Sequence, residues 1–207
     1  MKPRPLVKIC GVTRPEDAVA AADLGADLLG LNFYPPSPRC LEVARAVEIA
    51  DAVRGRLPLV GVFVHRPAAE VAEIDRAVGL DLLQFHGDEE PAEVAAWGAR
   101  AIRVFRRRQP PDAAELGETP DVWGFLFDVP HEALYGGTGE SWDYGAVAGV
   151  ATAKPVLLAG GVHPGNVRRA LSTSGAAGVD VCSGVESAPG IKDVRLMSRL
   201  LAEVRDG

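Results

Sequence analysis

The fold is decided by residues 155–185, which read PVLLAGGVHPGNVRRALSTSGAAGVDVCSGV. Two apolar runs in this segment are too short for globular helices, and each ends in glycine, at Gly160-Gly161 and at Ser183-Gly184. Glycine lets a ligand approach backbone N–H groups, and a following helix N-terminus favours an anion. One such pair is more often a tight turn, but two in consecutive units are typical of the phosphate site after strands seven and eight of a (β/α) barrel.

Composition and charge limit the class of protein. The chain has 207 residues, 47% apolar and 24% charged, so we expect residues 1–207 to form a single domain. A net charge of −6 argues against a nucleic-acid partner. No apolar stretch approaches the roughly 20 residues of a spanning helix, and the N-terminus leads into a strand without a signal-peptide core. We therefore expect a cytoplasmic protein with no membrane partner.

Cysteine and histidine usage gives no metal motif. The three cysteines, Cys10, Cys40 and Cys182, lack CxxC spacing, and the four histidines are scattered singly. This pattern fits a reducing compartment and predicts no metal site.

Short β-rich runs alternate with amphipathic helical stretches along the chain. The eight runs are Leu6–Gly11, Leu28–Phe33, Leu57–Val64, Leu82–Gly87, Ala101–Phe105, Trp123–Val129, Val156–Gly161 and Gly178–Gly184. The helical stretches are Pro15–Leu24, Leu41–Arg54, Pro67–Val78, Pro91–Trp97, the weaker Pro110–Gly117, Tyr144–Val150, Pro164–Leu171 and Ile191–Val204. Eight such units predict an α/β fold, a single (β/α)8 TIM barrel. A doubly wound sheet is the alternative, disfavoured because no GxGxxG follows the first strand.

The first strand ends with a lysine and a cysteine on one face. Side chains alternate along a strand, so Lys8 and Cys10 share one face while Val7 and Ile9 share the other. We expect the apolar pair to meet the helices and Lys8 and Cys10 to point into the barrel mouth. A nearby cation favours the thiolate and lowers a cysteine pKa from about 8.5. A small buried cysteine without a function is the alternative.

The loop after the second strand carries a candidate carboxylate ligand. Three prolines in Tyr34-Pro-Pro-Ser-Pro-Arg39 stiffen this loop, so Arg39 would lose little entropy on binding. An arginine held in this way suits a planar carboxylate, although a solvated arginine is the default for such a loop.

The fourth and fifth strands carry further basic side chains. His86 stands at a mouth position, where it can hydrogen-bond a ligand or serve only the structure. Arg103 lies on the face opposite Ile102 and Val104, where an ion pair would let it fill the barrel interior. The run 106–108, three arginines without interleaved aromatic residues, is interpreted as a solvated loop.

An aspartate, Asp128, ends the apolar run of the sixth strand. A carboxylate is costly to bury without a partner, and at this position it is a candidate general acid. The loop that follows contains Gly136-Gly137-Thr138-Gly139, which can fold over a ligand or contact a phosphate.

The assembled motifs resemble the phosphoribosylanthranilate isomerase family of tryptophan biosynthesis. Together they are highly specific and follow the family order over nearly the full length. They are Lys8-Ile9-Cys10-Gly11, Ser37-Pro38-Arg39, Gln84-Phe85-His86-Gly87, Gly136-Gly137-Thr138-Gly139, Leu158-Ala159-Gly160-Gly161, Val179-Asp180-Val181-Cys182-Ser183-Gly184-Val185-Glu186 and Pro189-Gly190-Ile191-Lys192-Asp193. Cys182 stands where the family more often has serine.

The resemblance implies a cofactor-free Amadori rearrangement of N-(5-phosphoribosyl)anthranilate, an interconversion of aldose and ketose forms. Asp128 would be the general acid, Cys10 the general base, and Arg39 the ligand of the anthranilate carboxylate. The phosphate would bind around Gly160, Gly161, Ser183 and Gly184. Lys8, His86, Gly136, Gly137 and Asp180 are the further substrate-binding candidates.

Two rival functions stay open at this point. An aldolase or lyase would form a Schiff base on Lys8, and a non-catalytic barrel would bind sugar phosphates without turnover. Acceptance of the related histidine-pathway aminoaldose is also open, as is the choice between monomer and homodimer.

Overall fold

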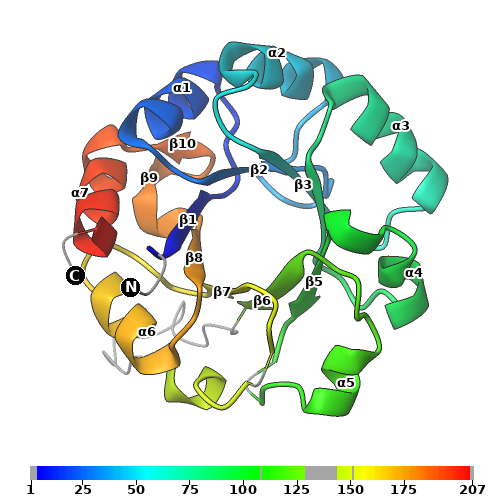
Figure 1. Cartoon of the computed structure of the whole chain (residues 1–207). Coiled ribbons are helices and arrows are strands. Elements are labelled where there is room, and N and C mark those ends of the chain that lie inside the picture. The colour runs from blue at the N-terminus through cyan, green and yellow to red at the C-terminus, as the bar shows by residue number, and fades with distance from the viewer. Residues whose placement is uncertain (1–3, 108, 129–143, 151, 206–207) are drawn as a thin grey trace.

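Eight parallel strands close into a barrel in chain order (Figure 1). The computed structural model describes residues 4–107, 109–128, 144–150 and 152–205. The strands are β1 (Leu6–Ile9), β2 (Leu28–Asn32), β3 (Leu59–Phe63), β4 (Leu82–Phe85), β5 (Ala101–Phe105), β6 (Gly124–Asp128), β7 (Val156–Ala159) and β8 (Gly178–Val181). Pairing of Lys8 with Asp180 and of Ile9 with Val181 closes the barrel between β1 and β8. The predicted (β/α)8 TIM barrel is confirmed.

The helices form a ring outside the strands (Figure 1). They are α1 (Pro15–Leu24), α2 (Val43–Val53), α3 (Ala68–Val78), α4 (Pro91–Ala95), α5 (Ala113–Gly117), α6 (Val167–Ser174) and α7 (Val194–Arg205), with 3₁₀ turns η1 (Gly98–Arg100), η3 (Tyr144–Val147) and η4 (Ser183–Val185). In α1, Pro15 supplies the fixed φ of a first helical turn, and Gly25 ends the helix with a φ of 82°. None of the helices in the described ranges has the length and apolarity to cross a membrane.

After β6, three of the predicted helices differ from the structure. Helix α6 begins at Val167 rather than Pro164, because Asn166 accepts a hydrogen bond from the His163 N–H in a turn before it. The stretch from Tyr144 forms a 3₁₀ turn instead of an α-helix. Residues Ile191–Lys192 form a short strand, β10, that pairs antiparallel with β9 (Glu186–Ala188), so α7 begins only at Val194.

Apolar side chains form two separate clusters. One fills the barrel interior and comprises Leu28, Val60, Leu82, Ile102, Val104, Leu126, Leu157 and Ala159. The other lies between the strands and the helices and includes Val7 and Ile9. This division follows from the alternation of side chains along each strand.

Arg103, whose role the sequence leaves undecided, does not fill the barrel interior. Ile102 and Val104 face inward, so Arg103 between them faces the helix layer. Its guanidinium donates to the Glu115 carbonyl at 2.8 Å, pairs with Glu118 at 2.9 Å and stacks on Phe105. The arginine therefore attaches β5 to α5 and stays away from the barrel mouth.

Candidate active site

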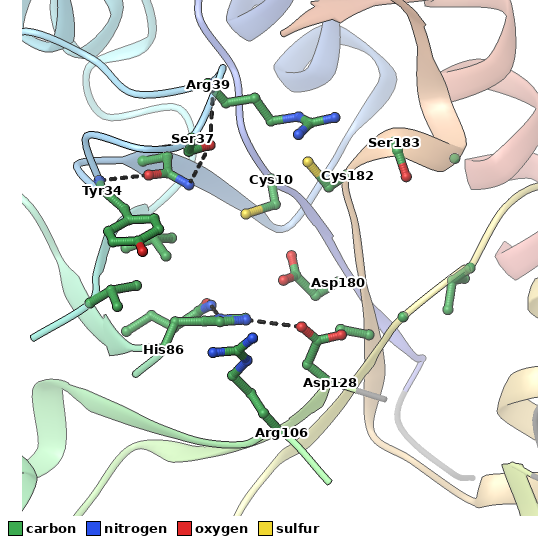
Figure 2. Close-up of a pocket in the computed structure, with 18 of the residues that line it drawn as sticks. Cys10, Tyr34, Ser37, Arg39, His86, Arg106, Asp128, Asp180, Cys182 and Ser183 are labelled. Atoms are coloured by element: carbon green, nitrogen blue, oxygen red, sulfur yellow. Dashed lines mark hydrogen bonds and ion pairs between the residues drawn. The ribbon is translucent and has the colours of Figure 1, made fainter. Parts of the chain in front are cut away.

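A cavity of about 470 Å³ opens at the carboxyl ends of the barrel strands (Figure 2). Most of the residues predicted from the sequence line it, namely Cys10, Arg39, His86, Asp128, Gly160, Gly161, Asp180, Ser183 and Gly184. Gly136 and Gly137 lie outside the described residues. Because these side chains come from strands far apart in the sequence, closure of the barrel is what assembles the cavity.

Lys8 lies beneath the cavity and does not line it. Its side chain is fully buried, and its ammonium group pairs with Asp180 at 2.9 Å. Burial lowers the pKa of Lys8, but the negative charges of Asp180 and Cys10 outweigh this effect and raise it. The predicted direct contact of Lys8 with substrate is therefore corrected: this lysine is a buried cation beneath the site.

A glycine on β2 makes room for this group. A Cβ at Gly30 would lie 2.8 Å from the Cys10 sulfur and 3.0 Å from the Lys8 nitrogen. Burial and the Cys10 charge raise the pKa of Asp180 to about 6, against the lowering effect of Lys8. Asp180 is thus a carboxyl group that can titrate near neutral pH at the floor of the cavity.

The environment of Cys10 favours its thiolate. A hydrogen bond with Cys182 lowers the pKa of Cys10 well below its ordinary value; burial opposes this, and the charges of Lys8 and Lys192 support it. The same hydrogen bond, together with burial, raises the pKa of Cys182. The pair therefore favours the thiolate at Cys10 and the protonated thiol at Cys182. A thiolate that borders the cavity is equipped to accept a proton.

Asp128 ends β6 on the other side of the cavity from Cys10 (Figure 2). Its carboxyl lies 3.0 Å from Nε2 of His86, whose Nδ1 lies 2.7 Å from the side-chain nitrogen of Gln84. The side-chain oxygen of Gln84 is buried and has no hydrogen-bond partner among the described residues. This chain of contacts holds the carboxyl of Asp128 toward the cavity. His86 accordingly positions Asp128, a role that the sequence alone left open.

Arg39 occupies the rim of the cavity in a two-point ion pair. Its Nε and Nη2 donate to the two Glu186 oxygens at 2.8 Å and 2.5 Å. Glu186 also accepts from Lys192 at 2.8 Å, and the hydrogen bonds from both cations lower its pKa against the effect of burial. In its loop, the Arg39 N–H donates to the Ser37 hydroxyl. The arginine therefore already binds one planar carboxylate, which belongs to the protein.

The two glycine-containing strand ends meet on one side of the cavity. Gly160 and Gly161 have φ values of 86° and 65°, in the region that glycine adopts without strain. A Cβ at Gly184 would lie 2.0 Å from the carbonyl oxygen of Val162. This close approach places η4 beside the loop after β7, and Gly160, Gly161, Ser183 and Gly184 line the same part of the cavity. Glycine-containing strand ends of this kind suit an anion.

The structure adds cavity residues that the sequence analysis did not select. They are Asn32, Tyr34, Ser37, Val62, Val64, Gln84, Arg106, Ala159, Val162 and Cys182. Arg106 is exposed and lies outside any helix or strand, as the solvated-loop interpretation expects, and it also borders the cavity beside His86 and Asp128 (Figure 2). Its position directly after β5 was the available signal, because residues that follow barrel strands reach the mouth.

Among the described residues, no group of three or more histidine, cysteine, aspartate or glutamate side chains is arranged to hold a metal ion. The described site offers a thiolate that can accept a proton from a bound molecule and a carboxyl group that can donate one to it. Both lie beside a surface suited to an anion.

Known proteins resemble this chain along nearly its whole length. The family model described as N-(5'phosphoribosyl)anthranilate (PRA) isomerase matches residues 7–203. The N-(5'-phosphoribosyl)anthranilate isomerase of Magnetococcus marinus is 43% identical over 199 residues, which cover 96% of this chain and 94% of that protein.

Solved structures agree with the sequence comparison. Phosphoribosyl anthranilate isomerase from Thermotoga maritima aligns with a TM-score of 0.86 and 29% identity, covering 98% of this chain and 100% of that one. A phosphoribosyl anthranilate isomerase in complex with reduced 1-(o-carboxyphenylamino)-1-deoxyribulose 5-phosphate aligns with a TM-score of 0.79 and 26% identity, with coverages of 98% and 100%. The chain therefore belongs to the N-(5'-phosphoribosyl)anthranilate isomerase family.

Proposed function

We propose that this chain converts N-(5-phosphoribosyl)anthranilate to 1-(2-carboxyphenylamino)-1-deoxyribulose 5-phosphate in tryptophan biosynthesis, with Asp128 as general acid and Cys10 as general base. One observation carries the assignment of roles: a thiol with a lowered pKa and a carboxyl group face each other across one cavity. Family membership supports the substrate, and so does the complex of a relative with reduced 1-(o-carboxyphenylamino)-1-deoxyribulose 5-phosphate.

The reaction begins at the ribose ring oxygen. Asp128 donates a proton to this oxygen, the bond between it and C1 breaks, and the nitrogen lone pair forms an iminium at C1. The contact with His86 holds the carboxyl in place for this step. The Cys10 thiolate then removes the proton from C2, and the electrons of that C–H bond form the C1–C2 double bond of an enolamine. Tautomerisation, with a proton added at C1, gives the ketone at C2. Each proton transfer contributes about 10²–10⁴ in rate.

Binding of the substrate uses the two ends of the cavity. The phosphate occupies the surface formed by Gly160, Gly161, Ser183 and Gly184. The anthranilate carboxylate binds at Arg39. Because Nε and Nη2 of this arginine already donate to Glu186, the substrate would bind to Nη1. His86 and Asp180 border the space for the ribose hydroxyl groups between these ends. Gly136 and Gly137, in the loop after β6, stay candidates for contact with the ligand.

A Schiff-base mechanism on Lys8 does not fit this geometry. Such chemistry requires a neutral amine that substrate can reach. Lys8 is fully buried, is paired with Asp180 and has a raised pKa, each of which opposes nucleophilic attack.

The test is to incubate the purified protein with freshly prepared substrate, follow the loss of its fluorescence and identify the product by proton NMR. The proposal predicts a new methylene group at C1 and a ketone at C2. Phosphate-ligand binding without turnover would instead support a non-catalytic barrel. Borohydride trapping of substrate on Lys8 would support the lyase.

The proposed setting is the cytoplasm, with the chain acting as a monomer or homodimer. Solved forms of the Thermotoga maritima isomerase include a dimer and monomers made from it. Light scattering after gel filtration decides between the two states for this chain.

A further inference from the structure

Two cysteines occupy neighbouring positions where β1 and β8 close the barrel. Lys8 pairs in register with Asp180 and Ile9 with Val181, and the Cys10 N–H continues the ladder by donating to the Val181 carbonyl at 2.9 Å. The next pair in this register is Cys10 with Cys182. Adjacent strands lie about 4.8 Å apart, which is inside the Cα–Cα range of about 4.4–6.8 Å that a disulfide spans.

The side chains of this pair lie on the same face. The two cysteines directly follow the last residues of β1 and β8, beyond the Lys8–Asp180 pair, whose side chains touch at 2.9 Å across these strands. Cys10 and Cys182 are the pair two residues further along, and both line the cavity (Figure 2). Both cysteines therefore border the space that a small oxidant would enter.

Two buried lysines lie beside this pair, together with the carboxylates of Asp180 and Glu186. The Lys192 ammonium lies 3.8 Å from the Cys182 sulfur, and its side chain is fully buried. The Lys8 ammonium, which lies beneath the cavity, interacts electrostatically with the Cys10 sulfur. Cations favour the thiolate, which is the form of cysteine that attacks peroxides and disulfides.

We infer that Cys10 and Cys182 form a peroxide-reactive dithiol that closes to a disulfide and reversibly blocks the site. The Cys10 thiolate attacks one peroxide oxygen, the O–O bond breaks, and the departing oxygen leaves as water after protonation. The sulfur of the resulting sulfenic acid is then attacked by Cys182, so that the S–S bond forms while the S–O bond breaks and a second water leaves. The two thiols lose two electrons, and one peroxide is reduced to two waters.

The inference concerns the two sulfurs and does not depend on isomerase activity. The primary readout is therefore covalent. Reduced protein, with free cysteines at positions 10, 40 and 182, is treated with about a tenfold excess of hydrogen peroxide, alkylated and analysed by intact mass and peptide mapping. The expected product has lost two hydrogens, joins the Cys10 and Cys182 peptides, and is alkylated only at Cys40. Any isomerase activity falls at least tenfold in the same samples and returns with dithiothreitol.

Two variants serve as controls, each compared with its own reduced form. Cys40→Ser is expected to form the same disulfide as the wild type. In Cys182→Ser the sulfenic acid at Cys10 has no second thiol, so it proceeds to sulfinic acid, which dithiothreitol does not reverse. Sulfinic acid at Cys10 of the wild type without a disulfide would overturn the inference. So would a disulfide between Cys10 and Cys40, or three thiols that all stay free.

Discussion

At the scale of single residues, the proposed role of Cys10 as a base requires surroundings that favour its thiolate. The largest cause of its lowered pKa is the hydrogen bond with Cys182, and the charges of Lys8 and Lys192 add to it against burial. A general base must be deprotonated, so activity is lost as pH falls through the pKa of Cys10 in the free enzyme. With a pKa below the ordinary value of about 8.5, that loss occurs at a lower pH than for an isolated thiol.

Cys182→Ala removes the hydrogen bond, so the pKa of Cys10 rises and the acidic limb of the kcat/KM profile moves to higher pH. Cys182→Ser keeps a donor and should move the limb less. The measurement is kcat/KM across the pH range for both variants, with Cys40→Ala as a control outside the cavity. An acidic limb that is unchanged in Cys182→Ala would show that Cys182 does not set the ionisation of Cys10.

Lys8 and Asp180 provide a residue-scale prediction on stability. Replacing Lys8 by methionine leaves the buried Asp180 carboxylate without its partner, and we expect a loss of about 3–5 kcal/mol in the free energy of unfolding. The double variant Lys8→Met/Asp180→Asn should recover part of this loss. Urea unfolding of both variants measures the change in the free energy of unfolding. The comparison is Arg54→Ala, which breaks an exposed ion pair with Asp51. Equal stability of Lys8→Met and Arg54→Ala would contradict the assigned pairing.

At the scale of elements, the proposed phosphate site consists of η4 and the loop after β7. Their contact depends on Gly184, where a Cβ would lie 2.0 Å from the Val162 carbonyl oxygen. Gly184→Ala must push the two segments apart and misplace their N–H groups. We expect KM to rise at least tenfold with a smaller change in kcat, since binding of the phosphate is common to the ground and transition states.

Gly149→Ala is the matched control, because a Cβ at Gly149 would meet nothing within 4 Å. Inhibition by inorganic phosphate gives a second readout for both variants. If Gly184→Ala and Gly149→Ala have the same KM and the same affinity for phosphate, the phosphate does not bind at η4.

The sequence predicted the elements that follow simple periodicity and missed those set by turns. Short, continuous apolar runs located all eight strands. Each barrel strand must bury one face against the helices and the other inside the barrel, so both faces are apolar. The β9–β10 pair and the late start of α7 were missed, because two or three residues are too few to show a period. The direction of the Arg103 side chain could not be predicted, because alternation shows only that it lies opposite Ile102 and Val104. In the structure these two side chains face inward, so Arg103 faces outward.

At the scale of the whole molecule, barrel closure brings Cys10 next to Cys182 and Arg39 next to Glu186. The motifs predicted which residues surround the cavity, since the ends of parallel strands share one face of a barrel. They did not predict the pairing of Arg39 with Glu186 or the contact of His86 with Asp128. These contacts depend on side-chain directions across strands, which one-dimensional spacing does not contain.

The central claim is that this barrel uses Cys10 as the base and Asp128 as the acid of the isomerisation. The most direct test is kcat/KM for N-(5-phosphoribosyl)anthranilate, measured for the wild type, Cys10→Ala and Asp128→Asn, with circular dichroism to verify folding. The account predicts turnover by the wild type and a loss of about 10²–10⁴ in each folded variant. A folded variant of either residue with a kcat/KM close to that of the wild type would contradict the account.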